Sequence, residues 1–220
     1  MTGNSRTVVS NQAFIHQELE KIVRNHMEHD YLKPVSGHTL NAFKEIEKAF
    51  SLGVKSIVLD SGCGTGYSTV ILAKRFPESL VIGLDKSDIR LRKTKHKERF
   101  DNVLFVRADQ FDFWHLLVKA GWPVVKHCMY YPNPWPKKAH IKRRIHGHPA
   151  FVELPKLTKN IEVRSNWLTY VQEFAAAWQI LTHEDLILEK IEPVQPVSLF
   201  EKKFKESGHQ LYRLVTRSNN

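Results

Sequence analysis

Two short segments carry residue types whose spacing could do chemistry. Residues 130–144 read YYPNPWPKKAHIKRR, so three prolines alternate with an asparagine and a tryptophan before a basic run. Proline fixes φ and lacks an amide donor, so we expect a stiff loop rather than a helix or a central strand. An amide, an indole and a basic cluster on a rigid loop suit a nucleic-acid base and its phosphates. The alternative is a proline-rich surface connection followed by a solvated charge run.

The second segment, residues 60–66, reads DSGCGTG between the apolar run 57–59 and a helical pattern over 68–75. Glycines at alternate positions allow a tight strand-to-helix turn and let backbone amides approach a ligand. Another apolar run, 80–84, ends in Asp85, and a carboxylate there can accept hydrogen bonds from ribose hydroxyls. The glycines read G-x-G-x-G rather than the G-x-G-x-x-G of dinucleotide-binding proteins. This spacing counts against NAD as the ligand.

Together the two segments resemble the tRNA (guanine-N7)-methyltransferase family, whose members use S-adenosylmethionine. The family's loop reads Pro-acid-Pro-Trp-Pro-Lys-Lys before a basic run, and residues 131–138 here read YPNPWPKK. The resemblance covers most of the chain from about residue 50. It implies a Rossmann-like class I methyltransferase, an α/β fold with a doubly wound, mostly parallel sheet and an antiparallel C-terminal strand pair.

The resemblance also implies S-adenosylmethionine as the cofactor. The predicted cofactor contacts are Asp60, Gly62, Gly64, Gly66, Asp85 and Asp109. The three glycines would pass close to the methionine part of the cofactor, and Asp60 would accept from its ammonium group. Asp85 would hold the ribose hydroxyls. Asp109 resembles the acid that family members place near the adenine amino group; its alternative role is the N-cap of a helix over residues 110–118.

The substrate side departs from the family at two predicted catalytic residues. Asn133 stands where the family usually has an aspartate, and Ser165-Asn166 stand where it often has Thr-Asp. Guanine N7 carries a free lone pair, so methyl transfer there needs positioning rather than removal of a proton. A loop carboxylate would accept from guanine N1–H and from the exocyclic amine, whereas Asn133 can accept only one such bond. The departure therefore weakens the expectation of guanine specificity more than that of methyl transfer.

The remaining predicted substrate contacts are aromatic and basic: Trp135, Lys137, Lys138, Lys142, Arg143, Arg144 and Tyr170. The basic members would position RNA through its phosphates rather than read its sequence. Trp135 would stack on the target base or pack against its own prolines, and Tyr170 would face the substrate or lie in the core. Residues 86–99 are interpreted as a solvated helix face. The histidines at 140, 146 and 148 lack the spacing of a metal site, so no metal is expected.

Composition sets wider limits on the protein. A chain of 220 residues fits one domain, with residues 1–50 as an N-terminal helical extension. The formal charge of +10 implies an anionic partner, here tRNA or another structured RNA. No apolar segment approaches the roughly 20 residues needed to cross a bilayer, and no signal-peptide core is visible. We therefore expect a cytoplasmic protein without a membrane partner, and a monomer by default. Cys63 is expected to fit its turn rather than act as a nucleophile.

Hydrophobic periodicity predicts the elements that position these residues. Helices are expected over 11–29, 39–50, 68–75, 110–118 and from 167 to 178, and strands over 56–59, 80–84, 103–106, 124–130, 161–164, 186–191 and 210–215. Alternating strands and helices favour a parallel doubly wound sheet with ligands at the strand ends. Residues 1–11 are predicted to be disordered. The first helix is expected to cap the sheet rather than touch RNA through Lys21 and Arg24.

The functional hypothesis is an S-adenosylmethionine-dependent RNA methyltransferase that methylates guanine N7 in tRNA. One alternative is an adenine or other amino-methyltransferase acting on nucleic acid, because Asn-Pro-Trp at 133–135 is similar to the Asn-Pro-Pro-aromatic loop of those enzymes. Another is a non-catalytic RNA-binding protein on the same fold. The two amides favour that alternative, whereas the glycine loop and Asp85 count against it.

Overall fold

A computed structural model describes residues 3–50, 53–93 and 100–217, without the side chains of residues 49 and 50. The chain divides into two compact units, each described by itself. Unit 1 contains Met1–Leu32, Tyr131–Pro155 and Ile161–Asn220, and unit 2 contains Lys33–Tyr130 and Lys156–Asn160. The expectation of a single domain with an N-terminal extension stays a prediction.

Unit 2 contains a parallel sheet. Its strands are β1 (Ile57–Ser61), β2 (Leu80–Asp85), β3 (Val103–Arg107) and β4 (Val124–Tyr130). They run parallel in the order β3-β2-β1-β4. Every residue of β1 and β2 is buried, as expected for parallel strands covered on both faces. Since Ser61 is in register with Leu84, the carboxyl ends of these two strands are level and the residues that follow them lie at one edge.

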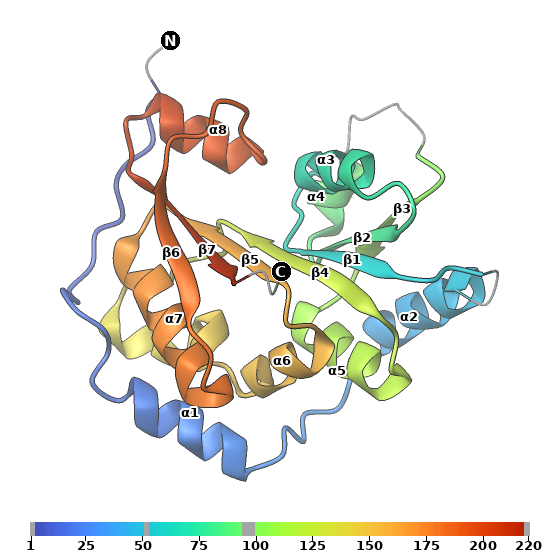
Figure 1. Cartoon of the computed structure of the whole chain (residues 1–220), viewed down its shortest axis with the longest axis horizontal. Helices are drawn as coiled ribbons and strands as arrows, with labels where there is room; N and C mark the ends of the chain where they lie inside the picture. The colour runs from blue at the N-terminus through green and yellow to red at the C-terminus, as the bar shows by residue number, and fades with distance from the viewer. Residues whose placement is uncertain (1–2, 51–52, 94–99, 218–220) are drawn as a thin grey trace. The chain divides into compact units, whose positions relative to one another are not determined.

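Helices cover both faces of this parallel sheet. They are α2 (Gly37–Phe50), α3 (Tyr67–Arg75), α4 (Asp88–Arg92) and α5 (Gln110–Ala120). Figure 1 shows α3 and α4 on one face of the strands and α2 and α5 on the other. Helix α5 ends at Gly121, whose φ of 65° is the left-handed conformation typical of a helix C-terminus. This arrangement confirms the predicted doubly wound α/β pattern.

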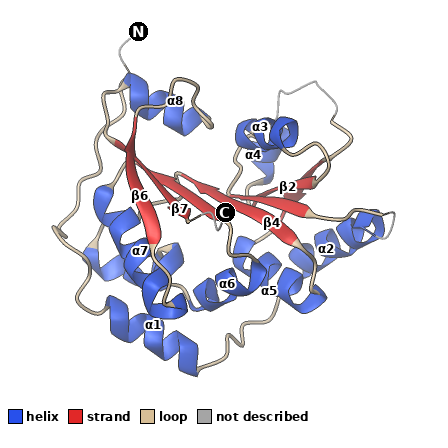
Figure 2. Ribbon diagram, viewed as in Figure 1, coloured by secondary structure: helices blue, strands red, loops and turns tan. Residues whose placement is uncertain are grey.

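Unit 1 contains antiparallel strands. Its elements are α1 (Leu19–Glu28), the 3-10 helices η1 (Lys138–Arg143), η2 (Ile145–Gly147) and η3 (Pro149–Glu153), β5 (Ile161–Ser165), α7 (Leu168–Thr182), β6 (Leu186–Ile191), α8 (Leu199–Glu206) and β7 (Leu211–Thr216). The short α6 (Leu154–Leu157) contains the boundary between the units. Strand β7 pairs antiparallel with both β5 and β6, which confirms the predicted C-terminal pair. Helix α7 packs against these strands and against α1 (Figure 2).

The N-terminal residues differ from prediction. Helix α1 begins at Leu19 rather than at residue 11. Residues 3–11 were predicted to be disordered, but Gly3 N–H donates to the Glu206 carbonyl at 2.8 Å and Lys138 N–H donates to Asn11 Oδ1 at 2.9 Å. The prediction of disorder is wrong because this polar stretch finds hydrogen-bond partners far along the chain. No described helix is both long enough and apolar enough to cross a membrane.

The proline-rich run also differs in its second half. Residues 130–144 were expected to contain no helix, yet Lys138–Arg143 form η1. The last proline is Pro136, so later amides can bond, and His140 N–H donates to the Lys137 carbonyl at 2.9 Å. In the basic segment 86–99, α4 covers Asp88–Arg92, and residues 94–99 lie outside the described residues.

Candidate functional site

The predicted cofactor residues all lie in unit 2, at the ends of its strands. Gly62, Gly64 and Gly66 have φ values of 79°, 61° and 76°, a region that glycine adopts without strain. The amides of Gly62 and its successor both donate to the Leu84 carbonyl at 2.8 Å, which ties the glycine loop to β2. A Cβ at Gly66 would lie 2.3 Å from the Phe105 ring, whereas at Gly62 and Gly64 it would meet no described atom within 4 Å. The loop is therefore tightly packed at its end and open at its start, where backbone can approach a ligand.

Asp60 is a buried carboxylate at the end of β1, with 1% of its surface exposed. Its Oδ2 accepts from the hydroxyls of Ser68 at 2.6 Å and Thr69 at 2.7 Å. Burial raises its pKa from 3.8 to about 6, although the two hydroxyls oppose this shift, and the nearby charge of Asp85 raises it further. A buried carboxylate that accepts from neutral hydroxyls is well suited to accept also from a cationic group such as an ammonium.

Asp85 links the glycine loop to the end of β2. Its Oδ2 accepts from Gly64 N–H at 3.0 Å, and its Oδ1 accepts from Ser87 N–H at 2.7 Å. The Arg90 guanidinium lies 3.2 Å from the same Oδ1. Each carboxylate oxygen can accept two hydrogen bonds, so Oδ2 has acceptor capacity left for a hydroxyl. This capacity is what the predicted ribose contact requires.

Asp109 precedes α5 and caps it. Its Oδ1 accepts from Phe111 N–H at 3.0 Å and from Asp112 N–H at 3.3 Å. Its own amide donates to the Thr39 hydroxyl at 3.0 Å. Oδ1 of Asp109 therefore acts as the N-cap of α5, as the alternative prediction stated. Its Oδ2 takes part in no hydrogen bond within the described part of the chain and can accept from an amino group.

A buried polar cluster beside the end of β1 has no counterpart in the sequence prediction. Trp114 Nε1–H donates to Ser61 Oγ at 3.0 Å, and the Ser61 hydroxyl lies 2.8 Å from His127 Nε2. Burial lowers the pKa of His127 to about 3, so this ring is neutral at physiological pH. The only signal in the sequence was a histidine inside the apolar run of β4.

Two other chemistries find little support in unit 2. Burial raises the pKa of the Cys63 thiol, with Asp60 and Asp85 adding to the shift, so the nucleophilic thiolate is disfavoured. Among the residues that the structure describes, no group of three or more His, Cys, Asp or Glu side chains is placed to hold a metal ion.

The predicted substrate residues lie in unit 1, beginning with the proline loop. Tyr131 and Trp135 have φ values of 52° and 45°, which are strained for residues that are not glycine. Asn133 is exposed, and its Oδ1 accepts from Trp135 N–H at 3.3 Å. The amide oxygen is thus turned toward the backbone but keeps one acceptor site, and both hydrogens of the NH₂ group are available to contact a base.

Asn166 follows β5 and presents the opposite group. Its Nδ2 lies 3.0 Å from His209 Nδ1, and His209 Nε2 lies 3.0 Å from the Ser5 carbonyl. A carbonyl can only accept, so we assign the ring proton of His209 to Nε2 and the acceptor role to Nδ1. The Asn166 amide then donates to His209, and its oxygen is left to accept. Unit 1 therefore offers a donor at Asn133 and an acceptor at Asn166.

The basic cluster after the prolines is largely solvent-facing. Lys137, Lys142 and Arg143 are exposed, Lys138 is half-buried, and no ion pair in the described part of the chain involves any of the four. The Arg143 guanidinium lies 4.9 Å from the centroid of the Trp135 ring, a cation–π arrangement. These side chains can reach phosphates without breaking an existing ion pair.

Arg144 and Tyr170 differ from their expected role in substrate binding. Both are fully buried. Arg144 forms an ion pair with Glu173 and stacks over Trp167, with its guanidinium carbon 4.9 Å from the ring centroid. Tyr170 packs edge-on against His146. They therefore stabilise the interior of unit 1, and adjacent arginines in the sequence gave no signal that one of them is buried.

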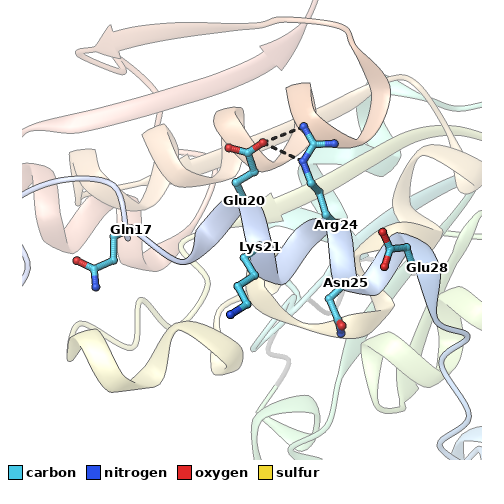
Figure 3. A pocket seen from close by; sticks show the side chains of 6 residues that line it. All are labelled: Gln17, Glu20, Lys21, Arg24, Asn25 and Glu28. Carbon is cyan, nitrogen blue, oxygen red and sulfur yellow. Dashed lines mark hydrogen bonds and ion pairs between the residues drawn. The ribbon is translucent and has the colours of Figure 1, made fainter.

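The outer face of α1 forms a shallow polar hollow. It is lined by Gln17, Glu20, Lys21, Arg24, Asn25 and Glu28. Figure 3 shows Gln17 on the turn before α1 and the other five side chains projecting from the helix, with Glu20 and Arg24 paired at 2.8 Å. The opposite face buries Leu19 and Val23. Helix α1 packs mainly against α7, η2 and η3, so it lies on other helices of unit 1 rather than capping the sheet directly as predicted. The exposed Glu20–Arg24 ion pair contributes little stability by itself.

The sequence matches known proteins over most of its length. Residues 54–214 match the model of a family described as "Putative methyltransferase". The tRNA (guanine-N(7)-)-methyltransferase of Aquifex aeolicus (strain VF5) is 26% identical over 170 residues, which cover 74% of this chain and 57% of that protein. The protein of the same name from Neisseria meningitidis serogroup A is 27% identical over 167 residues, which cover 72% of this chain and 70% of that protein.

Solved structures share the fold. The 16S rRNA methyltransferase KamB is similar with a TM-score of 0.57 at 16% identity, over 85% of this chain and 95% of that one. A 16S rRNA (adenine(1408)-N(1))-methyltransferase from Catenulisporales acidiphilia, solved with its cosubstrate SAM, has a TM-score of 0.52 at 16% identity, over 80% of this chain and 92% of that one. Identities this low show a common fold alone.

Proposed function

The chain belongs to the methyltransferase family whose model covers residues 54–214, and from this premise we propose that it is an S-adenosylmethionine-dependent RNA methyltransferase acting on guanine N7 in tRNA. The observation that carries the proposal is the pair of buried carboxylates, Asp60 and Asp85, at the ends of β1 and β2 beside an open glycine loop. The exposed proline loop with its unpaired basic cluster supports an RNA substrate. Relatives named for tRNA guanine-N7 methylation support the choice of base and RNA.

The cofactor contacts follow from the free acceptors of unit 2. The ammonium group of the cofactor is assigned to Asp60, the ribose hydroxyls to Asp85 Oδ2 and the adenine amino group to Asp109 Oδ2. The backbone at Gly62 and Gly64 leaves room for the methionine part. When bound, S-adenosylmethionine supplies a methyl group on a sulfonium, which is open to attack by a lone pair.

Methyl transfer to guanine N7 does not require the protein to remove a proton from the base first. The N7 lone pair forms the new N–CH₃ bond while the S–CH₃ bond breaks, and no proton has to leave first. Catalysis then comes from holding the base in line with the methyl group, and effective molarities for such positioning reach about 10⁵–10⁸ M. We therefore assign Asn133 and Asn166 to holding the base.

The two amides together fit a base edge that presents an acceptor beside a donor. Asn133 Nδ2 would donate to guanine O6, and Asn166 Oδ1 would accept from guanine N1–H. Adenine presents N1 as acceptor beside its N6 amine as donor, so the same pair also fits adenine. An adenine methyltransferase is for this reason the second candidate.

The basic cluster is assigned to the phosphates of the RNA. Lys137, Lys138, Lys142 and Arg143 would position the strand, with Trp135 and Arg143 together forming a surface on which a base can stack. We expect the protein to act as a monomer in the cytoplasm and without a metal ion.

The test is nucleoside mass spectrometry after incubation of unmodified tRNA with the purified protein and methyl-labelled S-adenosylmethionine. The expected product is labelled 7-methylguanosine, lost in Asn133→Ala and retained in Asn25→Ala, which removes an exposed amide from α1. Labelled adenosine would move the assignment to the second candidate. Absence of label together with absence of cofactor-induced thermal stabilisation would refute the proposal and favour a non-catalytic RNA-binding protein.

A further inference from the structure

The proline loop is held by backbone contacts on four consecutive residues. The first contacts come from a buried cation: Arg144 Nε and Nη2 donate to the Trp135 carbonyl at 3.2 and 3.1 Å. Nη2 also lies 3.4 Å from the Lys137 carbonyl. Trp135 is one of two loop residues with a strained positive φ, here 45°, and the guanidinium holds its carbonyl.

The second set of contacts comes from the N-terminal segment. The Ser10 hydroxyl donates to the Pro136 carbonyl at 2.5 Å. Lys138 N–H donates to Asn11 Oδ1 at 2.9 Å. These partners lie more than a hundred residues apart in the sequence, so the contacts fix the loop against a distant part of the chain rather than within itself.

Glu173 on α7 joins the two sets of contacts. Its Oε2 pairs with Arg144 and lies 3.0 Å from His146 Nε2. Its Oε1 accepts from Gln12 Nε2 at 2.6 Å and from His16 N–H at 2.9 Å. Burial would raise the pKa of Glu173, but the hydrogen bonds of His146 and Gln12 and the charge of Arg144 hold it at about 2. Gln12 contacts Arg144 as well as Glu173, because its Oε1 accepts from Arg144 Nη2 at 3.1 Å.

We propose that residues 10–16 are a positioning element for the substrate loop, and that Gln12 and Glu173 are positioning residues acting through Arg144. Gln12 and Glu173 set the guanidinium, the guanidinium sets the Trp135 carbonyl, and that carbonyl sets the direction in which Asn133 and Trp135 point. The segment lies before residue 54, where the family match begins, and so is outside everything that the match describes. The inference rests on the proposed function only where it predicts a change in the kcat of tRNA methylation.

The experiment compares two glutamine variants of the full chain. Gln12→Ala removes the side chain between Arg144 and Glu173, and Gln17→Ala removes an exposed glutamine in the turn before α1 (Figure 3). Hydrogen exchange is measured in peptides covering 131–144 and, as an internal reference, 57–66. S-adenosylmethionine affinity and the kcat and KM for tRNA methylation are measured on the same samples.

In Gln12→Ala we expect exchange in 131–144 to become at least about tenfold faster, with 57–66 unchanged. The kcat is expected to fall about tenfold or more, since misplacement by about 1 Å can cost about 10²-fold, while cofactor affinity stays within about twofold. Gln17→Ala should match the wild type in every measurement. A merely structural role for Gln12 would instead speed exchange in both peptides, 131–144 and 57–66, and weaken cofactor affinity.

A second variant decides the matter if Gln12→Ala weakens the whole fold. Ser10→Ala/Asn11→Ala removes the contacts to the Pro136 carbonyl and the Lys138 amide, together with the 3.0 Å hydrogen bond from Gln12 N–H to Ser10 Oγ, and leaves the side chains of Gln12 and Arg144 unchanged. Faster exchange confined to 131–144 supports the proposal, and wild-type exchange there in this variant overturns it. If the wild-type protein labels no nucleoside, the proposed function fails while the exchange comparison still tests the positioning element.

Discussion

Replacing Asp60 by asparagine is expected to stabilise the fold at neutral pH while weakening cofactor binding. The carboxylate is buried and accepts hydrogen bonds from the hydroxyls of Ser68 and Thr69. Burial raises its pKa from 3.8 to about 6, and the Asp85 charge adds to that shift. An asparagine has nearly the same shape and keeps one oxygen for the hydroxyls, but it carries no charge to desolvate.

The size of the effect follows from linkage between ionisation and folding. The folded pKa of Asp60 lies above the unfolded value, so its favourable contribution is complete below pH 3.8 and is lost as pH rises through about 6. A shift of about two units corresponds to about 3 kcal/mol, of which about 2 kcal/mol is lost between pH 4.5 and 7.5. The free energy of unfolding of Asp60→Asn should therefore rise relative to the wild type by about 2 kcal/mol across that range.

The assay is urea unfolding followed by circular dichroism, for both proteins, at several pH values between 4.5 and 7.5. Only the difference between the two proteins is interpreted, because other titrating groups cancel in it. Calorimetric titration with S-adenosylmethionine supplies the second readout, and the wild-type affinity should strengthen as pH rises through 6, whereas the variant's should not. A difference in unfolding free energy that stays constant with pH would refute the assigned burial and pKa of Asp60.

Two further predictions concern neighbouring or buried basic groups. Arg143→Gln should reduce the slope of log binding constant against log salt concentration for RNA by about one and leave stability unchanged, as filter binding and urea unfolding can measure. Arg144→Gln should lower the free energy of unfolding in urea by about 3–5 kcal/mol, because it leaves Glu173 buried without its partner. The opposite ranking would show that the burial of the two arginines is misassigned. The folded pKa of His127 lies below its ordinary value, so the wild type should lose stability as pH falls below 6.5. The free energy of unfolding of His127→Gln should therefore rise relative to the wild type by about 2 kcal/mol between pH 7.5 and 5. A difference between the two proteins in urea unfolding that does not change with pH would contradict this.

The strands and the glycine turn could be predicted from sequence because local rules decide them. Continuous apolar runs read as buried parallel strands, and their bounds agree with β1, β2 and β4 to within two residues. The positive φ values at Gly62, Gly64 and Gly66 are the reason that glycine stands at these positions. The C-terminal strands β6 and β7 were also predicted, although burial does not alternate along either of them.

The contacts that order the substrate loop could not be predicted from sequence. Arg143 and Arg144 are adjacent and chemically identical, and only the position of Glu173 on α7 decides which of them is buried. Residues 3–11 have the polar composition of a disordered terminus, yet Ser10 and Asn11 find backbone partners more than a hundred residues away. Such contacts depend on packing between distant segments, to which periodicity and propensity carry no signal.

The two buried carboxylates of unit 2 give a physical reason for a cationic cofactor. Asp60 and Asp85 are both buried, and the Asp85 charge adds to the burial that raises the pKa of Asp60. Arg90 is paired with Asp85, whereas Asp60 accepts from the uncharged hydroxyls of Ser68 and Thr69. A ligand that brings an ammonium group to Asp60 would therefore recover free energy that the protein loses on ionising this side chain. On the proposed assignment, the burial that weakens the fold at neutral pH would also favour binding of a positively charged ligand over a neutral one.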